Sequence, residues 1–166
     1  MGEIHRSKDS PADWLKGKSA LVIGGTGGIG AEITRLLTQS GVQAEVASRS
    51  SDQYVDVTDE KSIESLFANI SQRFGKVNIL IFCVGLLIKR RIDEMRTEEW
   101  DWVYNTNLRG AFFTLKHLHR ILKPHGRAIF IGSSSYSLGR EDYAAYSSSK
   151  AALILSNSEG KLLLRI

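Results

Sequence analysis

The sequence predicts an α/β fold, a doubly wound parallel sheet of the Rossmann type. Wholly apolar runs, in "SALVIGG", "VNILIFCVG" and "RAIFIGSS", are typical of strands buried on both faces. Segments with apolar residues at helical spacing lie between these runs. The first run leads into the glycine-rich stretch "GGTGGIG", which opens the next helical segment. Strands that alternate with helices predict a parallel sheet covered on both faces.

The first half of the chain contains three of the predicted strands. Residues 1–16 are polar and predict a flexible N-terminal arm, so that 17–166 form a single nucleotide-binding domain. A strand in "SALVIGG" precedes a helix that runs to Gly41 with Ile29, Ile33, Leu36 and Leu37 at helical spacing. "VQAEVAS" and "YVDVTD" predict the second and third strands. The helix after them carries an apolar face and ends at Gly75, the face being Ile63, Leu66, Phe67, Ile70 and Phe74.

The second half continues the alternation. "VNILIFCVG" predicts strand four, and Thr97, followed by two glutamates, predicts a helix cap. One long helix is expected from there to "KPHG", with an apolar face of Val103, Leu108, Phe112, Leu115, Leu118 and Leu122. "RAIFIGSS" predicts strand five, and a last helix runs through "YAAYSSSKAALIL".

Composition excludes several classes of protein. The 166 residues are 42% hydrophobic and 24% charged, and the net charge of +4 is dispersed rather than gathered in a basic patch, so no nucleic-acid partner is expected. No apolar run is long enough to span a bilayer, and no cluster has metal-ligand spacing. The single cysteine, Cys83, excludes an internal disulfide and suggests a reducing compartment, the cytoplasm; its apolar setting predicts a buried, inert thiol.

The glycine-rich stretch predicts a nucleotide site. A strand, a glycine loop and a helix N-terminus present free amide N–H groups and a helix dipole to a pyrophosphate. Two registers are open: Gly25, Gly27 and Gly30 fit G-x-G-x-x-G, whereas Gly24, Gly28 and Gly30 fit a looser G-x-x-x-G-x-G.

The residue that follows strand two predicts the cofactor. An acid there would bond the ribose 2′-OH of NAD, whereas an arginine pairs with the 2′-phosphate of NADP. The sequence has Arg49 at this point, and Glu45 lies too early in the strand to reach, so NADP is favoured over NAD. An arginine after a strand is also a common surface residue. Asp56 after strand three either accepts from the adenine amino group or only forms a turn.

Three polar residues near the end of the chain predict redox chemistry. Tyr146 and Lys150 are four residues apart, one turn of helix, so the lysine cation favours the phenolate and lowers the tyrosine pKa from its usual ~10. Ser133 ends strand five, at the carboxyl edge where such sheets bind ligands. Its hydroxyl can hold a carbonyl or carbinol oxygen while Tyr146 exchanges the proton.

With these motifs the chain resembles the short-chain dehydrogenase/reductase family. "GGTGGIG", "VDVTD", "NLRG", "IGSSS" and "YSSSKAA" lie in the family's order from Ser19 to about Leu155. The resemblance implies the looser glycine register, with Ile29 packed beneath the loop. It implies catalytic roles for Tyr146 (acid/base), Lys150 (pKa modifier and ribose contact), Ser133 (substrate-oxygen anchor) and Asn107 (helix-bending residue of a proton relay). Its implied cofactor contacts are Gly24, Thr26, Gly28, Ile29, Gly30, Arg49, Asp56, Val57, Gly85, Tyr146 and Lys150.

The sequence departs from the family pattern in three places. "FCVG" replaces the usual "NNAG" after strand four, and only "RSSDQ" joins strands two and three, too short for a crossover helix. The family also continues well beyond Lys150, whereas this chain ends at Ile166, which predicts missing final strands and an unprotected edge on strand five.

These departures leave three functions open. The first is an NADP-dependent oxidoreductase for a small carbonyl or alcohol substrate, either truncated or completed by a partner subunit. The second is a nucleotide-binding remnant or sensor without turnover, and the third a sugar-nucleotide epimerase, which the short connection and the Asn107 motif disfavour. The resemblance implies a homodimer or homotetramer. The basic run Lys89–Arg91 is either a contact for an acidic substrate or a solvated loop.

Overall fold

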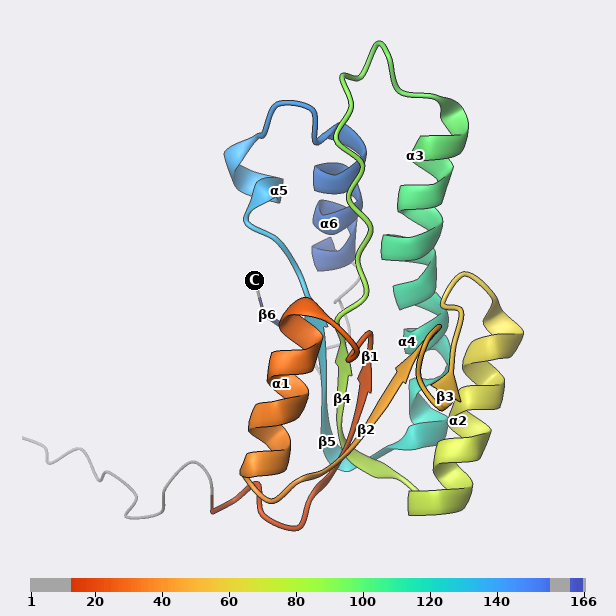
Figure 1. Ribbon diagram of the computed structural model, residues 1–166, viewed down its shortest axis with the longest axis vertical. Coiled ribbons are helices and arrows are strands. Elements are labelled where there is room, and N and C mark those ends of the chain that lie inside the picture. The colour runs from red at the N-terminus through yellow and green to blue at the C-terminus, as the bar shows by residue number, and fades with distance from the viewer. Residues whose placement is uncertain (1–12, 156–161, 166) are drawn as a thin grey trace, which may run out of the picture.

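A single parallel sheet organises the computed structural model, which describes residues 13–155 and 162–165. Its strands lie in the order β3-β2-β1-β4-β5-β6 (Figure 1). Their bounds are β1 (Ser19–Ile23), β2 (Gln43–Ser48), β3 (Gln53–Tyr54), β4 (Val77–Phe82), β5 (Leu122–Ile131) and β6 (Leu162–Arg165). Every pairing is parallel. The order reverses between β1 and β4, as in a doubly wound sheet, so the predicted fold class is confirmed.

Helices cover both faces of the sheet. They are α1 (Gly28–Gln39), α2 (Glu60–Phe74), α3 (Thr97–Tyr104), α4 (Gly110–Ile121), α5 (Ser135–Leu138) and α6 (Ala144–Leu155). One core cluster packs Ile33 and Leu37 of α1 against Val22 on one face of β1. The other, larger cluster joins α2, α4 and the end of α6 to the opposite face, through Leu21 and Ile23. The side chains of β1 therefore alternate between two cores, and all five of its residues are buried.

The long helix expected from Thr97 to Leu122 is interrupted by a π-helical segment, η1 (Asn105–Arg109). Its wide turn is closed by a hydrogen bond from the Gly110 amide to the Asn105 carbonyl. A π turn adds one residue to the helix and so rotates every later side chain. Phe112, predicted to be buried, is 54% exposed, and the buried residues of α4 are Gly110, Ala111, Phe113, Thr114, His117 and Ile121.

The short connection between β2 and β3 lacks a helix, as the sequence predicts. Only residues 49–52 separate the strands, and two residue pairs are formed, Ala47 with Gln53 and Ser48 with Tyr54. Serine side chains hold this loop: the Ser50 amide donates to Ser48 Oγ at 3.0 Å, and Ser51 Oγ donates to the Gln53 carbonyl at 3.0 Å. The loop thereby projects Arg49 from the carboxyl end of β2.

Both ends of β5 differ from the sequence prediction. Leu122 belongs to the strand, pairing with Val77, and "KPHG" forms an irregularity inside β5 before the regular pairing resumes with Arg127 opposite Ile79. The outer edge of β5 pairs with β6, from Ala128 with Leu162 to Ile131 with Arg165. The expected unprotected edge is therefore wrong, because the short apolar stretch "LLL" near the chain end supplies a strand that covers it.

The N-terminal arm and the cap of α3 also differ from the sequence prediction. Most of the predicted N-terminal arm lies outside the described residues, but 13–16 form a turn in which Leu15 packs on the α1-side core. Helix α3 is capped by Arg96, one residue before the predicted Thr97. The Arg96 amide donates to Glu99 Oε2 at 3.1 Å, so the acid of the first turn reaches back to the cap.

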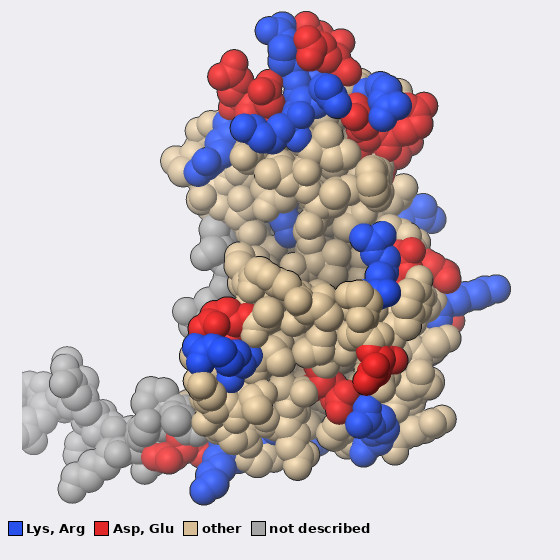
Figure 2. Space-filling model, viewed as in Figure 1, with Lys and Arg blue, Asp and Glu red and all other residues tan. Residues whose placement is uncertain are grey.

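Charges of both signs are interspersed on the surface. Figure 2 shows lysines, arginines and acids mixed at the end of the molecule formed by the loop before α3. In that loop Arg90 pairs with Glu99 and Arg91 with Asp93, which favours the solvated-loop interpretation of the basic run. Within residues 13–155 and 162–165 no helix is long and apolar enough to cross a bilayer. The same residues include no group of three potential metal ligands.

Candidate nucleotide-binding and catalytic site

The glycine loop joins β1 to α1 and has three positions that exclude a side chain. Gly24 and Gly28 have φ of +84° and +51°, which L side chains rarely adopt. At Gly30 a Cβ would lie 2.2 Å from the Gly24 carbonyl oxygen, so any larger residue would push the helix off the loop. Gly27 is extended and has open space around it. Gly25 is also tight, because a Cβ there would lie 3.0 Å from Thr34 Oγ1. The looser register is favoured because all three of its glycines are constrained, whereas the tighter one includes the unconstrained Gly27.

The N-terminus of α1 has the features of an anion site. The first amides of a helix have no partners within it. Here the cap, Gly27, has no side chain, and the first turn has no acid to offset the positive end of the dipole. Ile29, predicted to pack beneath the loop, is instead 64% exposed. The loop beside it consists largely of glycine and offers few side chains for packing.

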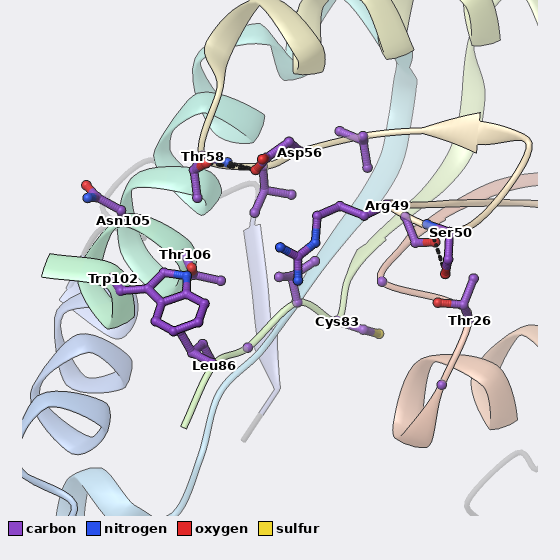
Figure 3. Close-up of a pocket in the computed structure, with 17 residues that line it drawn as sticks. Thr26, Arg49, Ser50, Asp56, Thr58, Cys83, Leu86, Trp102, Asn105 and Thr106 are labelled. Carbon is purple, nitrogen blue, oxygen red and sulfur yellow. Dashed lines mark hydrogen bonds between the residues drawn. The ribbon is translucent and has the colours of Figure 1, made fainter. Parts of the chain in front are cut away.

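A cleft of about 680 Å³ opens between this loop and α3, at the carboxyl ends of β1, β2 and β4 (Figure 3). Six of the predicted cofactor residues line it: Gly24, Thr26, Arg49, Asp56, Val57 and Gly85. Gly28, Ile29 and Gly30 are outside the lining. The cleft lies where the strand order reverses, the place at which doubly wound sheets bind ligands.

Arg49 and Asp56 form the charged part of the cleft. The Arg49 side chain extends into the space from the β2–β3 loop (Figure 3). Asp56 Oδ1 accepts from the amide and the hydroxyl of Thr58, at 2.9 and 2.7 Å, so this aspartate forms a turn. These two bonds, and then the charge of Arg49, hold the pKa of Asp56 below its usual value. Glu45 is paired with Arg73 at 3.1 Å, away from the cleft.

Lys150 is buried beside Tyr146 on α6. Lys150 is only 2% exposed, which is rare for a charged residue. Its Nζ donates a hydrogen bond of 2.8 Å to the carbonyl of Ile131, the last residue of β5. Nζ lies 6.0 Å from the centre of the Tyr146 ring. Burial lowers the pKa of Lys150 to about 8, which leaves it largely protonated at neutral pH. The tyrosine is half-buried, with its ring edge-on to Tyr143.

Ser133 lies just beyond β5, in the turn that leads into α5. Its Oγ is 2.9 Å from Ser135 Oγ and accepts from the Ser135 amide at 3.2 Å. Ser135 is 2% exposed, so the Ser133 hydroxyl is held on a buried partner. Ser133, Tyr146 and Lys150 do not line the cleft described above, and of the three Lys150 adjoins the cleft at Gly85. There a Cβ on Gly85 would be 3.5 Å from Lys150 Nζ, which shows how closely the two regions adjoin.

Asn107, in the π-helical segment, ties three elements together. Its side chain is fully buried. Oδ1 accepts from the Leu86 amide at 2.7 Å, and Nδ2 donates to the Leu86 carbonyl and to Ser149 Oγ at 3.0 Å each. Asn107 thus fixes the backbone that follows β4 against α6, next to Gly85 and Lys150.

The "FCVG" segment begins with the last residue of β4, and its other three residues line the cleft. Phe82 is fully buried and stacks on Phe130, so it contributes to the core. Cys83 is only partly buried and lines the cleft, which corrects the expectation of a wholly buried thiol. Burial raises its pKa to about 11, so the thiol stays protonated at neutral pH. The Asn107 side chain holds Leu86, the residue that follows this stretch.

Sequence reasoning missed one wall of the cleft. Trp102, Asn105 and Thr106 line it from α3 and η1. Their spacing of three and four residues places them on one helix face, a signal present in the sequence. Their place at the cleft depends on the packing of α3 and on the π turn, which the local sequence does not reveal. Thr58 was also missed, because it reaches the cleft through the turn in which it donates to Asp56.

Comparison with known proteins places the chain in a family. The sequence model of the family described as short chain dehydrogenase matches residues 18–159. The 3-oxoacyl-[acyl-carrier-protein] reductase FabG of Escherichia coli is 34% identical over 157 residues, which cover 84% of this chain and 64% of that protein. An uncharacterized oxidoreductase of Staphylococcus haemolyticus is 26% identical over 159 residues, covering 85% and 69%.

A solved structure agrees with the fold. The ligand-free aldohexose dehydrogenase of Thermoplasma acidophilum superposes with a TM-score of 0.80 at 21% identity, over 89% of this chain and 64% of that one. The chain thus spans 64% of the length of FabG and of this dehydrogenase. Because the family model matches most of its length, the chain belongs to the short-chain dehydrogenase/reductase family.

Proposed function

We propose that this chain binds NADP(H) in the cleft and exchanges a hydride between the nicotinamide and a small carbonyl or alcohol substrate. The observation that carries the proposal is the buried Lys150 amine beside the Tyr146 ring, next to the Gly85 end of a glycine-lined cleft. Burial of a cation lowers the stability of the fold, and ionisable groups with perturbed pKa values of this kind are concentrated at functional sites.

The residues present fit a dinucleotide. The side-chain-free surface at Gly24 and Gly27 and the acid-free start of α1 suit a pyrophosphate. Arg49 supplies a cation for a 2′-phosphate, while the acid of β2, Glu45, is engaged by Arg73. We therefore favour NADP over NAD. Asp56 uses Oδ1 for its turn, and we assign Oδ2 and the backbone of Val57 to the adenine.

The catalytic roles follow from the elements that hold each group. The cofactor, when bound, supplies or accepts the hydride. In reduction, Ser133 Oγ donates a hydrogen bond to the carbonyl oxygen and Tyr146 gives that oxygen its proton, which completes the alcohol. The Lys150 ammonium, anchored on the Ile131 carbonyl, stabilises the phenolate that remains. Asn107 keeps the Leu86 backbone in place for the nicotinamide side of the cleft.

The substrate class, the cellular compartment and the oligomeric state are proposed as well. FabG is named a 3-oxoacyl-[acyl-carrier-protein] reductase, which makes 3-oxoacyl thioesters one substrate class for a screen, together with aldehydes and ketones. We propose a cytoplasmic protein that forms a homodimer or homotetramer through α4 and α6. The exposed Phe112 on α4 supports this surface as the contact.

Two titrations test the cofactor assignment. NADPH and NADH are added to the wild-type chain and to Arg49→Ala, and binding is followed by the fluorescence of the reduced cofactor. NADPH should bind more tightly to the wild type, and Arg49→Ala should lose most of that preference, because the 2′-phosphate loses its charged partner. Arg120→Ala, which removes an arginine of α4 outside the cleft lining, is the matched control. Equal affinities for the two cofactors in the wild type would sink the NADP assignment.

Turnover is tested separately. NADPH oxidation is followed with aldehydes, ketones and 3-oxoacyl thioesters, for the wild type and for Tyr146→Phe. Tyr143→Phe, which alters the neighbouring ring just before α6, is the control. Activity that survives Tyr146→Phe unchanged would overturn the catalytic assignment. Tight NADPH binding with no activity toward any of the substrates would instead support a nucleotide-binding protein without turnover.

A further inference from the structure

Trp102 is a large aromatic side chain that the fold leaves exposed at a cleft. It lies on α3 between Trp100 and Tyr104, whose rings stack on each other with centroids 4.8 Å apart. Trp102 takes no part in that pair; it is 53% exposed and lines the cleft. An indole gains little stability from a half-exposed position, whereas flat aromatic surfaces at cleft walls are typical of ligand contacts.

The neighbours of Trp102 indicate which part of a ligand it meets. The cleft that it lines also contains Arg49, Asp56 and Thr58, and Ser133 and Tyr146 are outside that lining. Figure 3 shows the Arg49 side chain reaching into the cleft from the β2–β3 loop, while the Trp102 indole lies on the α3 side. The α3 wall of the cleft thus offers the apolar face of an indole. The other walls offer polar side chains that can bond the edge of a ligand's base or its phosphate.

We propose that Trp102 is the stacking surface for the adenine of the bound dinucleotide, which is enclosed between α3 and the β2–β3 loop. The inference rests on the proposed function and adds to it a residue that sets affinity at the adenosine end. Asn105 and Thr106, one helical turn further along the same face, form the rest of this wall. The chemistry recognised is a purine ring with a phosphate nearby, not the nicotinamide.

The expected effect is large enough to measure. Removal of an aromatic side chain on which a base stacks costs about 1–3 kcal/mol, so Trp102→Ala should weaken the binding of adenine-containing ligands by about 5-fold to 150-fold. Trp102→Phe keeps a ring and should restore most of the affinity. Trp14→Ala is the matched control, because Trp14 is similarly exposed, at 60%, and is outside the cleft lining.

The test separates the two halves of the cofactor. The full chain and the three variants are titrated with NADP⁺, with 2′,5′-ADP, which has the adenine and the 2′-phosphate, and with nicotinamide mononucleotide, which has neither. Trp102→Ala should weaken NADP⁺ and 2′,5′-ADP and leave the mononucleotide unchanged. Tryptophan emission should also be quenched by 2′,5′-ADP in the wild type and in Trp14→Ala, and this quenching should be lost in Trp102→Phe.

Three results would overturn the inference. Binding of 2′,5′-ADP to Trp102→Ala with wild-type affinity would show that no base stacks on the indole. An equal loss for 2′,5′-ADP and nicotinamide mononucleotide would show a general distortion of the cleft. If the wild type binds none of the three ligands, the proposed function fails first and this inference fails with it.

Discussion

The buried amine of Lys150 makes the stability of the protein depend on pH in a way that can be isolated. Burial lowers the pKa of Lys150 from 10.5 to about 8. One pKa unit corresponds to about 1.4 kcal/mol, so the folded state bears a penalty of about 3 kcal/mol when this lysine is charged. The Ile131 carbonyl, which accepts from Nζ, offsets part of the cost of leaving water but does not remove it.

The sign of the effect follows from where the proton is held. Below pH 8 the folded and unfolded chains both hold it, and the penalty is complete. Between about pH 8 and 10.5 the folded chain releases the proton while the unfolded chain keeps it, so stability rises with pH. Cys83, the neighbour whose charge would oppose this release, has its own pKa raised to about 11 and stays largely neutral up to pH 10.

Lys150→Met removes the titration and keeps the side-chain length. We expect the free energy of unfolding of the wild type minus that of Lys150→Met to increase by about 2–3 kcal/mol from pH 7 to pH 10. Urea unfolding at intervals of one pH unit measures this difference, and other groups that titrate in both proteins cancel. Lys61→Met, at an exposed lysine of α2, should show no such change. A difference that stays constant between pH 7 and 10 would refute the account of a buried, strained cation.

Two further predictions concern the packing that holds the site together. Gly110→Ala places a Cβ 2.9 Å from Cβ and Cγ2 of Val57, so it should lower the free energy of unfolding by about 1–3 kcal/mol in urea titration. Gly27→Ala, where the added Cβ meets open space, is the control, and a tolerated Gly110→Ala would contradict the packing. Asn107→Ala leaves the Leu86 amide and carbonyl and Ser149 Oγ without their partner, and it should cost at least about 2 kcal/mol. Asn105→Ala, on the same segment, should cost less than about 0.5 kcal/mol, and equal losses in the two variants would contradict the special role of Asn107.

The sheet was predictable because its strands are continuous apolar runs. "SALVI" is wholly buried and "VNILIF" nearly so, whereas "AIFI" alternates between buried and partly buried residues, and the glycine loop lies between the first strand and its helix. The short β2–β3 connection was equally plain from its length. These features depend on local sequence alone.

The features that the sequence did not predict depend on tertiary packing. The π turn at Asn105–Arg109 adds one residue before α4, so the predicted apolar face wrongly placed Phe112 inside. Trp102 lies before this turn, and its position at the cleft depends on how α3 packs beside the sheet. The family resemblance implied that Ile29 packs beneath the loop, but the glycine loop beside it gives it little to pack against. The protection of β5 by β6 could not be inferred because "LLL" lies beyond a polar stretch that breaks the helical pattern.

The central claim is that one cofactor spans the glycine-lined cleft and the Tyr146–Lys150 pair. Hydrogen–deuterium exchange of the full chain, with and without saturating NADP⁺, tests this directly. We predict slower exchange in four segments, residues 24–30, 49–58, 83–86 and 146–150, and unchanged exchange in the last turns of α2. Slowing confined to the first two segments would mean that the nucleotide does not reach the catalytic pair, and no slowing in any of the four would contradict the account.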